Sequence, residues 1–453
     1  MGTFYLQNFG CRTTQADGAA LERQMLERGL ARAATPQEAG VVVLNTCTVT
    51  ESADRDVRAA IRRIHRQNPE CRILVTGCYA QRAPQELAVL PGVSWVVGNS
   101  HKHQVAELVA PAKQGFVPVS TLATFSDHPI SQSPDQQILV GDIFAHTELL
   151  AAPVFAAETA SEKTRPNLKV QDGCDNRCSF CIIPAVRGES RSLARAEALR
   201  EVRALVAAGY RELVLSGINL GRWGRDLPKP ERFEDLVRAI LKETTLEKLR
   251  LSSVEPMDWT EELIALAAGE PRIAKHAHLP LQSGSDRILR AMHRKYRPWH
   301  YRERVEKIRR AMPLGALGAD VMAGFPGETD ALFEESRAFI ASLPFTYLHV
   351  FTYSSRPGTP SAEMPGQVPV QVARERNRIL RELAAKKNRE FRESLVGQRL
   401  EAITLGRGDG ESTEALTDNY VKMRVKGRYA PNRWVRAAVT GISEEGLIGS
   451  LSH

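Results

Sequence analysis

Three cysteines, Cys174, Cys178 and Cys181, follow one another with the spacing C-x3-C-x2-C. Three thiolates at this spacing can hold three irons of a cubane cluster and leave the fourth iron open to another ligand. An open coordination position is typical of a catalytic metal site, because structural sites complete their coordination with protein ligands. Common zinc modules instead use two C-x2-C pairs. The triplet therefore predicts a [4Fe–4S] cluster with a catalytic role.

Three further cysteines, Cys11, Cys47 and Cys78, each follow a short apolar run in the first ~110 residues. Helical patterns separate these runs, and such alternation with fully apolar strands predicts a parallel sheet. Ligands of such sheets bind beyond the carboxyl ends of the strands, so we expect these cysteines to converge there. The alternative is that they are ordinary buried cysteines. Cys71 begins the strand that Cys78 follows, roughly 20 Å away, and we expect it to be structural.

The composition is that of a soluble globular protein. The chain has 453 residues, is 43% hydrophobic and 25% charged, and carries a net charge of +8. This length predicts two or three domains. We find no apolar run of about twenty residues and no signal-peptide layout, and so expect no membrane partner. An odd total of seven cysteines favours a reducing cytoplasmic compartment with metal-bound thiolates.

The periodicity of the chain divides it into four parts. After the N-terminal parallel α/β domain comes a breaker-rich stretch with one expected strand at 138–140. Six strand-like runs then alternate with helices, which favours an open (β/α)6 partial TIM-type barrel over a closed eight-stranded one. Three short runs at 402–405, 420–425 and 436–440, separated by turns, predict a small antiparallel β-barrel of a kind that binds oligonucleotides. The predicted boundaries are 1–114, a linker at 115–163, 164–395 and 396–453.

Basic and aromatic side chains are interleaved in the last part. Basic residues can neutralise phosphates and aromatic rings can stack on bases, which predicts an RNA partner. If one strand extends from 422 to 428, its basic side chains share one face. A solvated strand face is the alternative reading, and a solvated helix is our reading of a second basic run at 374–392. The candidate RNA-binding residues are Lys422, Arg424, Lys426, Arg428, Arg433 and Trp434.

Nearly the whole chain outside the linker resembles the radical S-adenosylmethionine methylthiotransferases. The C-terminal barrel is similar to the TRAM domain of that family. The resemblance is carried by Asn45-Thr46-Cys47, Thr76-Gly77-Cys78, Gln171-Asp172-Gly173-Cys174, Pro184-x-x-Arg187-Gly188, Pro280-Leu281-Gln282-Ser283-Gly284-Ser285 and Gly324-Phe325-Pro326-Gly327-Glu328-Thr329.

The resemblance implies two [4Fe–4S] clusters. One, on Cys174, Cys178 and Cys181, would bind S-adenosylmethionine and generate a 5′-deoxyadenosyl radical that removes a hydrogen from a C–H bond. The other, on the three N-terminal cysteines, would supply sulfur, and a second S-adenosylmethionine would supply the methyl group. The protein would orient these groups and exclude water. An electron donor of the flavodoxin or ferredoxin type and a sulfur donor system are implied as partners.

Residues just after the expected strands of the barrel are candidates for contacts with S-adenosylmethionine or substrate. Each is as readily explained as a loop-capping or packing residue, so we predict them only as a set. They are Phe180, Ser216, Gly217, Asn219, Glu255, Gln282, Ser283, Asp320 and Tyr353.

Three branches of the family differ in substrate. Phe9-Gly10-Cys11-Arg12-x-x-Gln15, Asn45-Thr46-Cys47-Thr48-Val49-Thr50 and Arg250-Leu251-Ser252-Ser253-Val254-Glu255-Pro256 most resemble the branch acting on N6-threonylcarbamoyladenosine beside the tRNA anticodon. That branch usually has Asn where this chain has Thr14, and an aromatic–acid pair where it has Ala16-Asp17. The alternatives are isopentenyladenosine in tRNA, a ribosomal-protein aspartate, and a zinc-stabilised RNA-binding protein without catalysis.

Overall fold

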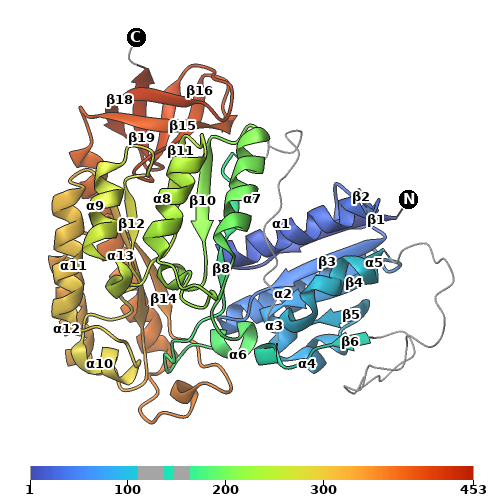
Figure 1. The fold of residues 1–453 in the computed structure, drawn as a ribbon. Helices are drawn as coiled ribbons and strands as arrows, with labels where there is room; N and C mark the ends of the chain where they lie inside the picture. Colours follow the sequence, from blue (N-terminus) through green and yellow to red (C-terminus); the bar gives the residue numbers. More distant parts are fainter. Residues whose placement is uncertain (1, 111–136, 146–163, 452–453) are drawn as a thin grey trace.

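The computed structural model describes residues 2–110, 137–145 and 164–451 (Figure 1). Three bodies follow one another along the chain: a blue-to-teal sheet with its helices, a green-to-orange half barrel, and a red β-barrel (Figure 1). Most of the expected linker, 115–163, lies outside the described residues. Its described part, residues 137–145, contains the predicted short strand.

The N-terminal body is a six-stranded sheet in which every pair of neighbours is parallel. The expected strand near residue 138 joins this sheet at its edge. In spatial order the strands are β2 (Ala31–Arg32), β1 (Thr3–Asn8), β3 (Val41–Thr46), β4 (Arg72–Gly77), β5 (Val93–Val97) and β6 (Gln137–Leu139).

Helices cover both faces of this sheet. Leu21 and Met25 of α1 pack on one face together with Val105, and Val57 and Ile61 of α2 pack on the other. Burial on both faces explains why the central strands are apolar without alternation. The helices and single turns are α1 (Arg12–Glu27), η1 (Pro36–Glu38), α2 (Glu51–Gln67), α3 (Cys78–Arg82), α4 (Pro84–Ala88), η2 (Asn99–Gln104), α5 (Val105–Val109) and η4 (Ile143–Ala145).

The central body is the predicted open half barrel of six parallel strands. Two three-stranded sheets are joined by single bridges from Leu249 to Ile273 and from Ser253 to His278. In spatial order the strands are β7 (Asn167–Lys169), β10 (Glu212–Ser216), β11 (Lys248–Leu251), β12 (His276–His278), β13 (Ala316–Ala323) and β14 (Tyr347–Thr352). A small hairpin of β8 (Gln171–Asp172) and β9 (Arg191–Ser192) flanks the first strand.

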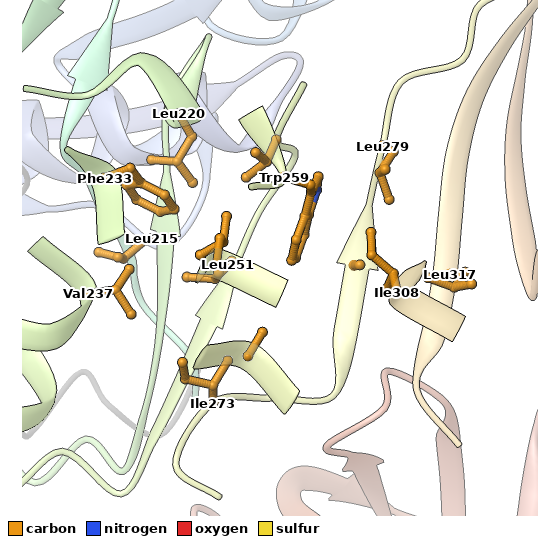
Figure 2. Close-up of a cluster of buried hydrophobic side chains, with 14 of the residues drawn as sticks. Leu215, Leu220, Phe233, Val237, Leu251, Trp259, Ile273, Leu279, Ile308 and Leu317 are labelled. Carbon is orange, nitrogen blue, oxygen red and sulfur yellow. The ribbon is translucent and has the colours of Figure 1, made fainter. Parts of the chain in front are cut away.

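The core of the half barrel lies between its strands and the helices outside them. Figure 2 shows Leu215 and Leu251 of the strands facing Phe233 and Val237 of α8, with Trp259 beside them. The helices and turns are α6 (Ile183–Arg187), α7 (Arg195–Ala207), η6 (Leu220–Arg222), α8 (Phe233–Glu243), η7 (Pro256–Asp258), α9 (Glu261–Gly269), α10 (Asp286–Ala291), α11 (Pro298–Ala311), α12 (Asp330–Ser342), η8 (Pro360–Ala362) and α13 (Val370–Ser394).

The C-terminal body is the predicted small closed barrel. Its neighbouring strands are antiparallel except for β17 and β19, which pair in parallel. The apolar runs predicted three strands, and the structure adds β16 and β19, whose sequences are polar or glycine-containing. The strands are β15 (Arg399–Gly408), β16 (Ser412–Thr417), β17 (Lys422–Lys426), β18 (Trp434–Ile442) and β19 (Leu447–Leu451).

The N-terminal body closes the open side of the half barrel. Helix α1 lies against the first strand, β7. Beyond the last strand, β14, Arg356 donates a 3.1 Å hydrogen bond to the carbonyl of Thr48 and forms a 2.6 Å ion pair with Asp54. The N-terminal sheet is thus held at both edges of the half barrel.

The C-terminal barrel covers the end of the half barrel at which its strands begin. Arg250 of β11 donates to the carbonyls of Asp418 and Thr417, at 2.9 and 3.3 Å. The same turn carries Tyr420, whose hydroxyl accepts a 2.8 Å hydrogen bond from Arg12 of the N-terminal body. The turn between β16 and β17 therefore contacts both other bodies. No helix within the described ranges is long and apolar enough to cross a membrane.

Candidate functional site

The three N-terminal cysteines lie together beyond the carboxyl ends of the strands of the parallel sheet. Cys47 follows β3, Cys78 begins α3 directly after β4, and Cys11 precedes α1. Thr46 pairs with Gly77 in register, so the last residues of β3 and β4 are neighbours. A Cβ atom at Gly10 would lie 2.5 Å from the Cβ of Cys47, so only glycine permits this approach. We call these cysteines the N-terminal triad.

Electrostatics confirm that these thiols are neighbours. The pKa of Cys47 is raised to about 12 by burial and by repulsion from the Cys78 and Cys11 thiolates. Asn99 donates to the sulfur of Cys78 at 3.5 Å. Cys71 lies apart from this group, in the hydrophobic core of the sheet, as expected.

The second group, Cys174, Cys178 and Cys181, lies in the loop between β8 and α6, and we call it the central triad. Backbone hydrogen bonds fix this loop, from Cys174 to Gly188 at 3.0 Å and from Cys181 to Cys178 at 3.1 Å. Burial and the neighbouring thiolates raise the pKa of Cys181 to about 12. Burial raises the pKa of Cys174 to about 11, with the Cys178 thiolate adding to the shift.

The two triads are adjacent. Cys78 packs against Ile182 and Val186, which follow directly after the central triad. Asn99, which contacts the sulfur of Cys78, also donates a 2.7 Å hydrogen bond to the carbonyl of Val186. The tertiary structure therefore brings the two triads together through the apolar contact of Cys78 with Ile182 and Val186.

The sulfur atoms of neither triad lie as close together as those around a single zinc ion. Tetrahedral zinc with Zn–S bonds of about 2.3 Å holds its thiolates roughly 3.8 Å apart. Among the described residues, neither triad has its three sulfur atoms all within 4.8 Å of one another. In a cubane cluster each thiolate binds a different iron, which separates the ligands further. Three thiols without a fourth protein donor suit [4Fe–4S] clusters with one open iron.

A buried network of charges joins the bodies beside the triads. The carboxylate of Asp17 in α1 forms 3.0 Å ion pairs with Lys102 and Arg187 and a close ion pair with Lys169. Lys169 and Arg187 also pair with Asp172 at 2.8 and 2.9 Å. Burial opposes ionisation of Asp17, but the three cations lower its pKa well below the usual range. Three cations against two carboxylates leave one positive charge near the N-terminal triad.

Two of the predicted contact residues lie beside the central triad. Asn219 donates from its amide to the sulfur of Cys174 at 3.7 Å, and its buried Oδ1 has no hydrogen-bond partner among the described residues. Glu255 accepts a 2.5 Å hydrogen bond from Arg294, which also donates to the sulfur of Cys178 at 3.2 Å. Cys178, Glu255 and Arg294 line one pocket. An unpaired acceptor and a polar pocket suit a polar ligand at this cluster.

The other predicted contact residues have structural partners. Phe180 and Tyr353 pack in one apolar cluster around Phe325. The rest are buried or backbone-constrained: Ser216 donates to the carbonyl of Leu168, Ser283 donates to Ser336, Gly217 lies against Gln171, and Gln282 adopts a φ of 68°. Asp320 lies inside the half barrel near two histidines.

The predicted RNA-binding residues lie on the C-terminal barrel. Lys422, Arg424 and Lys426 alternate with buried residues and share one exposed face of β17. The strand ends at Lys426 because Gly427 adopts a φ of 105°, so Arg428 lies outside it. Arg433 is exposed in the turn before β18. Trp434 packs under Lys248 of the half barrel, with Nζ 5.0 Å from the ring centre, and so lies at the joint between the two bodies.

Sequence reasoning missed the polar partners of the cysteines. Arg294 and Lys102 stand in stretches without a recognisable motif, and no local signal identifies them. Arg187 belongs to the motif Pro184-x-x-Arg187-Gly188, and Asp17 belongs to the pair Ala16-Asp17. Neither stretch of sequence predicts a buried ion pair. The basic helix α13 matches its predicted reading, since Arg378 forms exposed ion pairs with Glu375 and Glu382.

Comparisons with known proteins agree with this architecture. Residues 3–98 match the model of the Uncharacterized protein family UPF0004, and residues 168–340 match the Radical SAM superfamily. The fold resembles the radical S-adenosylmethionine methyltransferase TsrM from Kitasatospora setae, with a TM-score of 0.57 and 16% identity over 80% of this chain and 75% of that one. Fold and site together define a radical S-adenosylmethionine enzyme.

Full-length relatives narrow this class. The chain is 35% identical to a "Threonylcarbamoyladenosine tRNA methylthiotransferase MtaB" of Aquifex aeolicus, over 96% of this chain and 99% of that protein. It is 34% identical to a "tRNA-2-methylthio-N(6)-dimethylallyladenosine synthase" of Thermobifida fusca, over 96% of this chain and 83% of that protein. The chain belongs to the radical S-adenosylmethionine methylthiotransferase family. Its cofactors are S-adenosylmethionine and [4Fe–4S] clusters.

The buried Asp17 predicts a specific dependence of stability on acid. Its folded pKa is depressed, so its contribution is present above the unfolded pKa of about 3.9 and is lost as the pH falls below it. We expect Asp17→Asn to lower the free energy of unfolding by about 3 kcal/mol at pH 7, because three buried cations lose a partner. Urea unfolding of the metal-free protein between pH 7 and pH 3 measures both effects.

The variant should also lose part of the acid dependence of the wild-type protein. Asp330→Asn is the matched control, since the side chain of Asp330 is 97% exposed although it pairs with Arg376. An acid dependence in Asp17→Asn equal to that of the wild type would contradict the assignment.

Proposed function

We propose that this protein is a tRNA methylthiotransferase that converts N6-threonylcarbamoyladenosine, next to the anticodon, to its 2-methylthio derivative. The observation that carries the proposal is the contact of Cys78 with Ile182 and Val186, which puts the two triads side by side. A reaction that both activates a C–H bond and inserts sulfur needs two such centres within reach of one substrate atom. The similarity to relatives named for this substrate supports the choice of nucleoside.

The two triads would hold one cluster each. Cys174, Cys178 and Cys181 are the proposed ligands of the radical-generating cluster, and Cys11, Cys47 and Cys78 those of the auxiliary cluster. When bound, the clusters and S-adenosylmethionine supply the C–H activation, the sulfur insertion and the methyl transfer. Three thiols would hold each cluster and would leave one coordination position for S-adenosylmethionine at one cluster and for sulfur at the other.

Other residues of the chain orient the cysteine thiolates and offset their negative charge. Arg294 and Asn219 donate N–H groups to Cys178 and Cys174, and such hydrogen bonds fix thiolates and tune their clusters. Near the N-terminal triad, the buried surplus charge shared by Lys102, Lys169 and Arg187 offsets thiolate charge.

Partners and compartment follow from the same assignment. The tRNA would contact the exposed basic face of β17 together with Arg428 and Arg433, while Trp434 supports the joint beneath it. An electron donor of the flavodoxin or ferredoxin type and a sulfur donor system complete the proposed partners. We place the activity in the cytoplasm, where reduced thiols and tRNA occur together. The matches to dimethylallyladenosine synthases make isopentenyladenosine the second candidate nucleoside.

The nucleoside itself is tested by profiling modified tRNA. Deleting the gene should remove 2-methylthio-N6-threonylcarbamoyladenosine from bulk tRNA and leave the unthiolated nucleoside in its place, as measured by mass spectrometry. Restoring the wild-type chain should restore the product. Loss of the isopentenyl derivative would shift the assignment to the second nucleoside, and unchanged tRNA would reject a tRNA substrate.

The division of labour between the triads predicts different failures for two substitutions. Cys178→Ala removes a proposed ligand of the radical-generating cluster, so cleavage of S-adenosylmethionine to 5′-deoxyadenosine should stop. Cys47→Ala removes a ligand of the auxiliary cluster, so cleavage should continue without methylthio product. Cys71→Ala, in the hydrophobic core, is the control and should retain both. Product formation by a Cys47→Ala protein that lacks the auxiliary cluster would contradict the assignment.

The basic face of β17 predicts a salt-dependent contribution to tRNA binding. Reversing Lys422 and Lys426 to Glu should weaken binding and reduce the slope of log K against log salt by about one for each lost phosphate contact. Arg381 and Arg389 on the exposed side of α13 provide a matched double reversal that should change binding little. Equal losses in the two variants would show only a general charge effect, and would contradict an RNA site on the barrel.

A further inference from the structure

Three side chains of the types that bind metal ions lie inside the half barrel, on three adjacent strands. His278 belongs to β12, Asp320 to β13 and His349 to β14. Asp320 pairs with His349 in register, and His278 pairs with Gly318, two residues before Asp320. Side chains two residues apart on a strand share a face, so the pairing brings all three together. One ligand atom from each lies within 4.8 Å of the others.

The orientation of His278 leaves one ring nitrogen directed at this group. Its Nδ1 lies 2.9 Å from the hydroxyl of Ser253, which fixes the ring. Its buried Nε2 lies 3.3 Å from the Asp320 carboxylate, yet among the residues that the structure describes it has no partner with hydrogen-bond geometry. A histidine held through one nitrogen by a neighbouring side chain, with the other nitrogen turned to the site, is the usual arrangement of a metal-bound imidazole. His278 is only 7% exposed.

The distances match those of a tetrahedral cation. Bonds of about 2.0–2.1 Å from zinc to nitrogen or oxygen place neighbouring ligand atoms about 3.3 Å apart. The Asp320 oxygen lies 3.3 Å from His278 Nε2 and 3.2 Å from His349 Nδ1.

We propose that His278, Asp320 and His349 bind one divalent transition-metal cation, of the class that includes Zn²⁺ and Fe²⁺. Two imidazoles and one carboxylate are a donor set that both ions accept. The set contains no sulfur, so it is chemically distinct from the cysteine triads. The side chain of His349 is 53% exposed, which leaves the fourth position to water or another oxygen ligand. The site does not depend on the proposed function.

The test loads the cluster-containing enzyme with Zn²⁺, removes unbound metal, and measures zinc and iron per chain. About one zinc should remain in addition to the cluster iron. Absorption at the zinc edge should show nitrogen and oxygen neighbours at about 2.0–2.1 Å and no sulfur at about 2.3 Å. A parallel competition between Zn²⁺ and Fe²⁺ at equal concentration, read from the zinc retained, decides between the two cations.

Variants make the result decisive. His349→Ala should lose the zinc with unchanged cluster iron, and the protein should stay folded because the side chain of His349 is half exposed. Ser253→Ala should lower zinc affinity about 10- to 100-fold, because it frees the ring of His278. His300→Ala, an exposed histidine on α11, should bind as the wild type does. Absence of retained zinc, a sulfur-containing shell, or full retention by His349→Ala would each overturn the proposal.

Discussion

The arrangement of the site depends on the ion pairs of the buried Asp17 carboxylate. It lies on α1, six residues after Cys11, and is neutralised by Lys102 from its own body and by Lys169 and Arg187 from the half barrel. Replacing such a group by apolar residues often costs little, whereas leaving one partner unpaired costs several kcal/mol. The network therefore contributes mainly by admitting one relative position of the two bodies, the one in which both buried carboxylates are paired.

A second buried carboxylate fixes the other edge of the same joint. Asp54 follows Cys47 by seven residues and pairs with Arg82 of its own body and Arg356 from beyond β14. The N-terminal sheet is thereby held against both the first and the last strand of the half barrel. A single contact would allow rotation about it, but two contacts on opposite edges fix the distance and the direction between the two cysteine triads. Radical chemistry shared by two centres requires such a fixed separation.

The C-terminal barrel covers the end of the half barrel that lies away from the triads. Six strand residues at about 3.3 Å each separate the two ends by roughly 20 Å. The C-terminal barrel and the triads therefore lie at opposite ends of the half barrel. Tyr420 connects the two regions, since it lies in the turn that enters β17 and accepts a hydrogen bond from Arg12, the residue after Cys11.

The sequence by itself determined most of the strands, the half barrel and the grouping of six cysteines, because apolar periodicity and the position of a residue after a strand are local properties. The pattern missed β2 and β5 of the N-terminal sheet. It also missed β16 and β19, whose polar or glycine-containing sequences pair because neighbouring strands close a barrel. Only the tertiary structure decided that the triads adjoin and that Asp17 meets Lys169 and Arg187, which are 152 and 170 residues away in the chain. Charge pairing across such separations depends on burial at a domain joint, and no local pattern of residues records that burial.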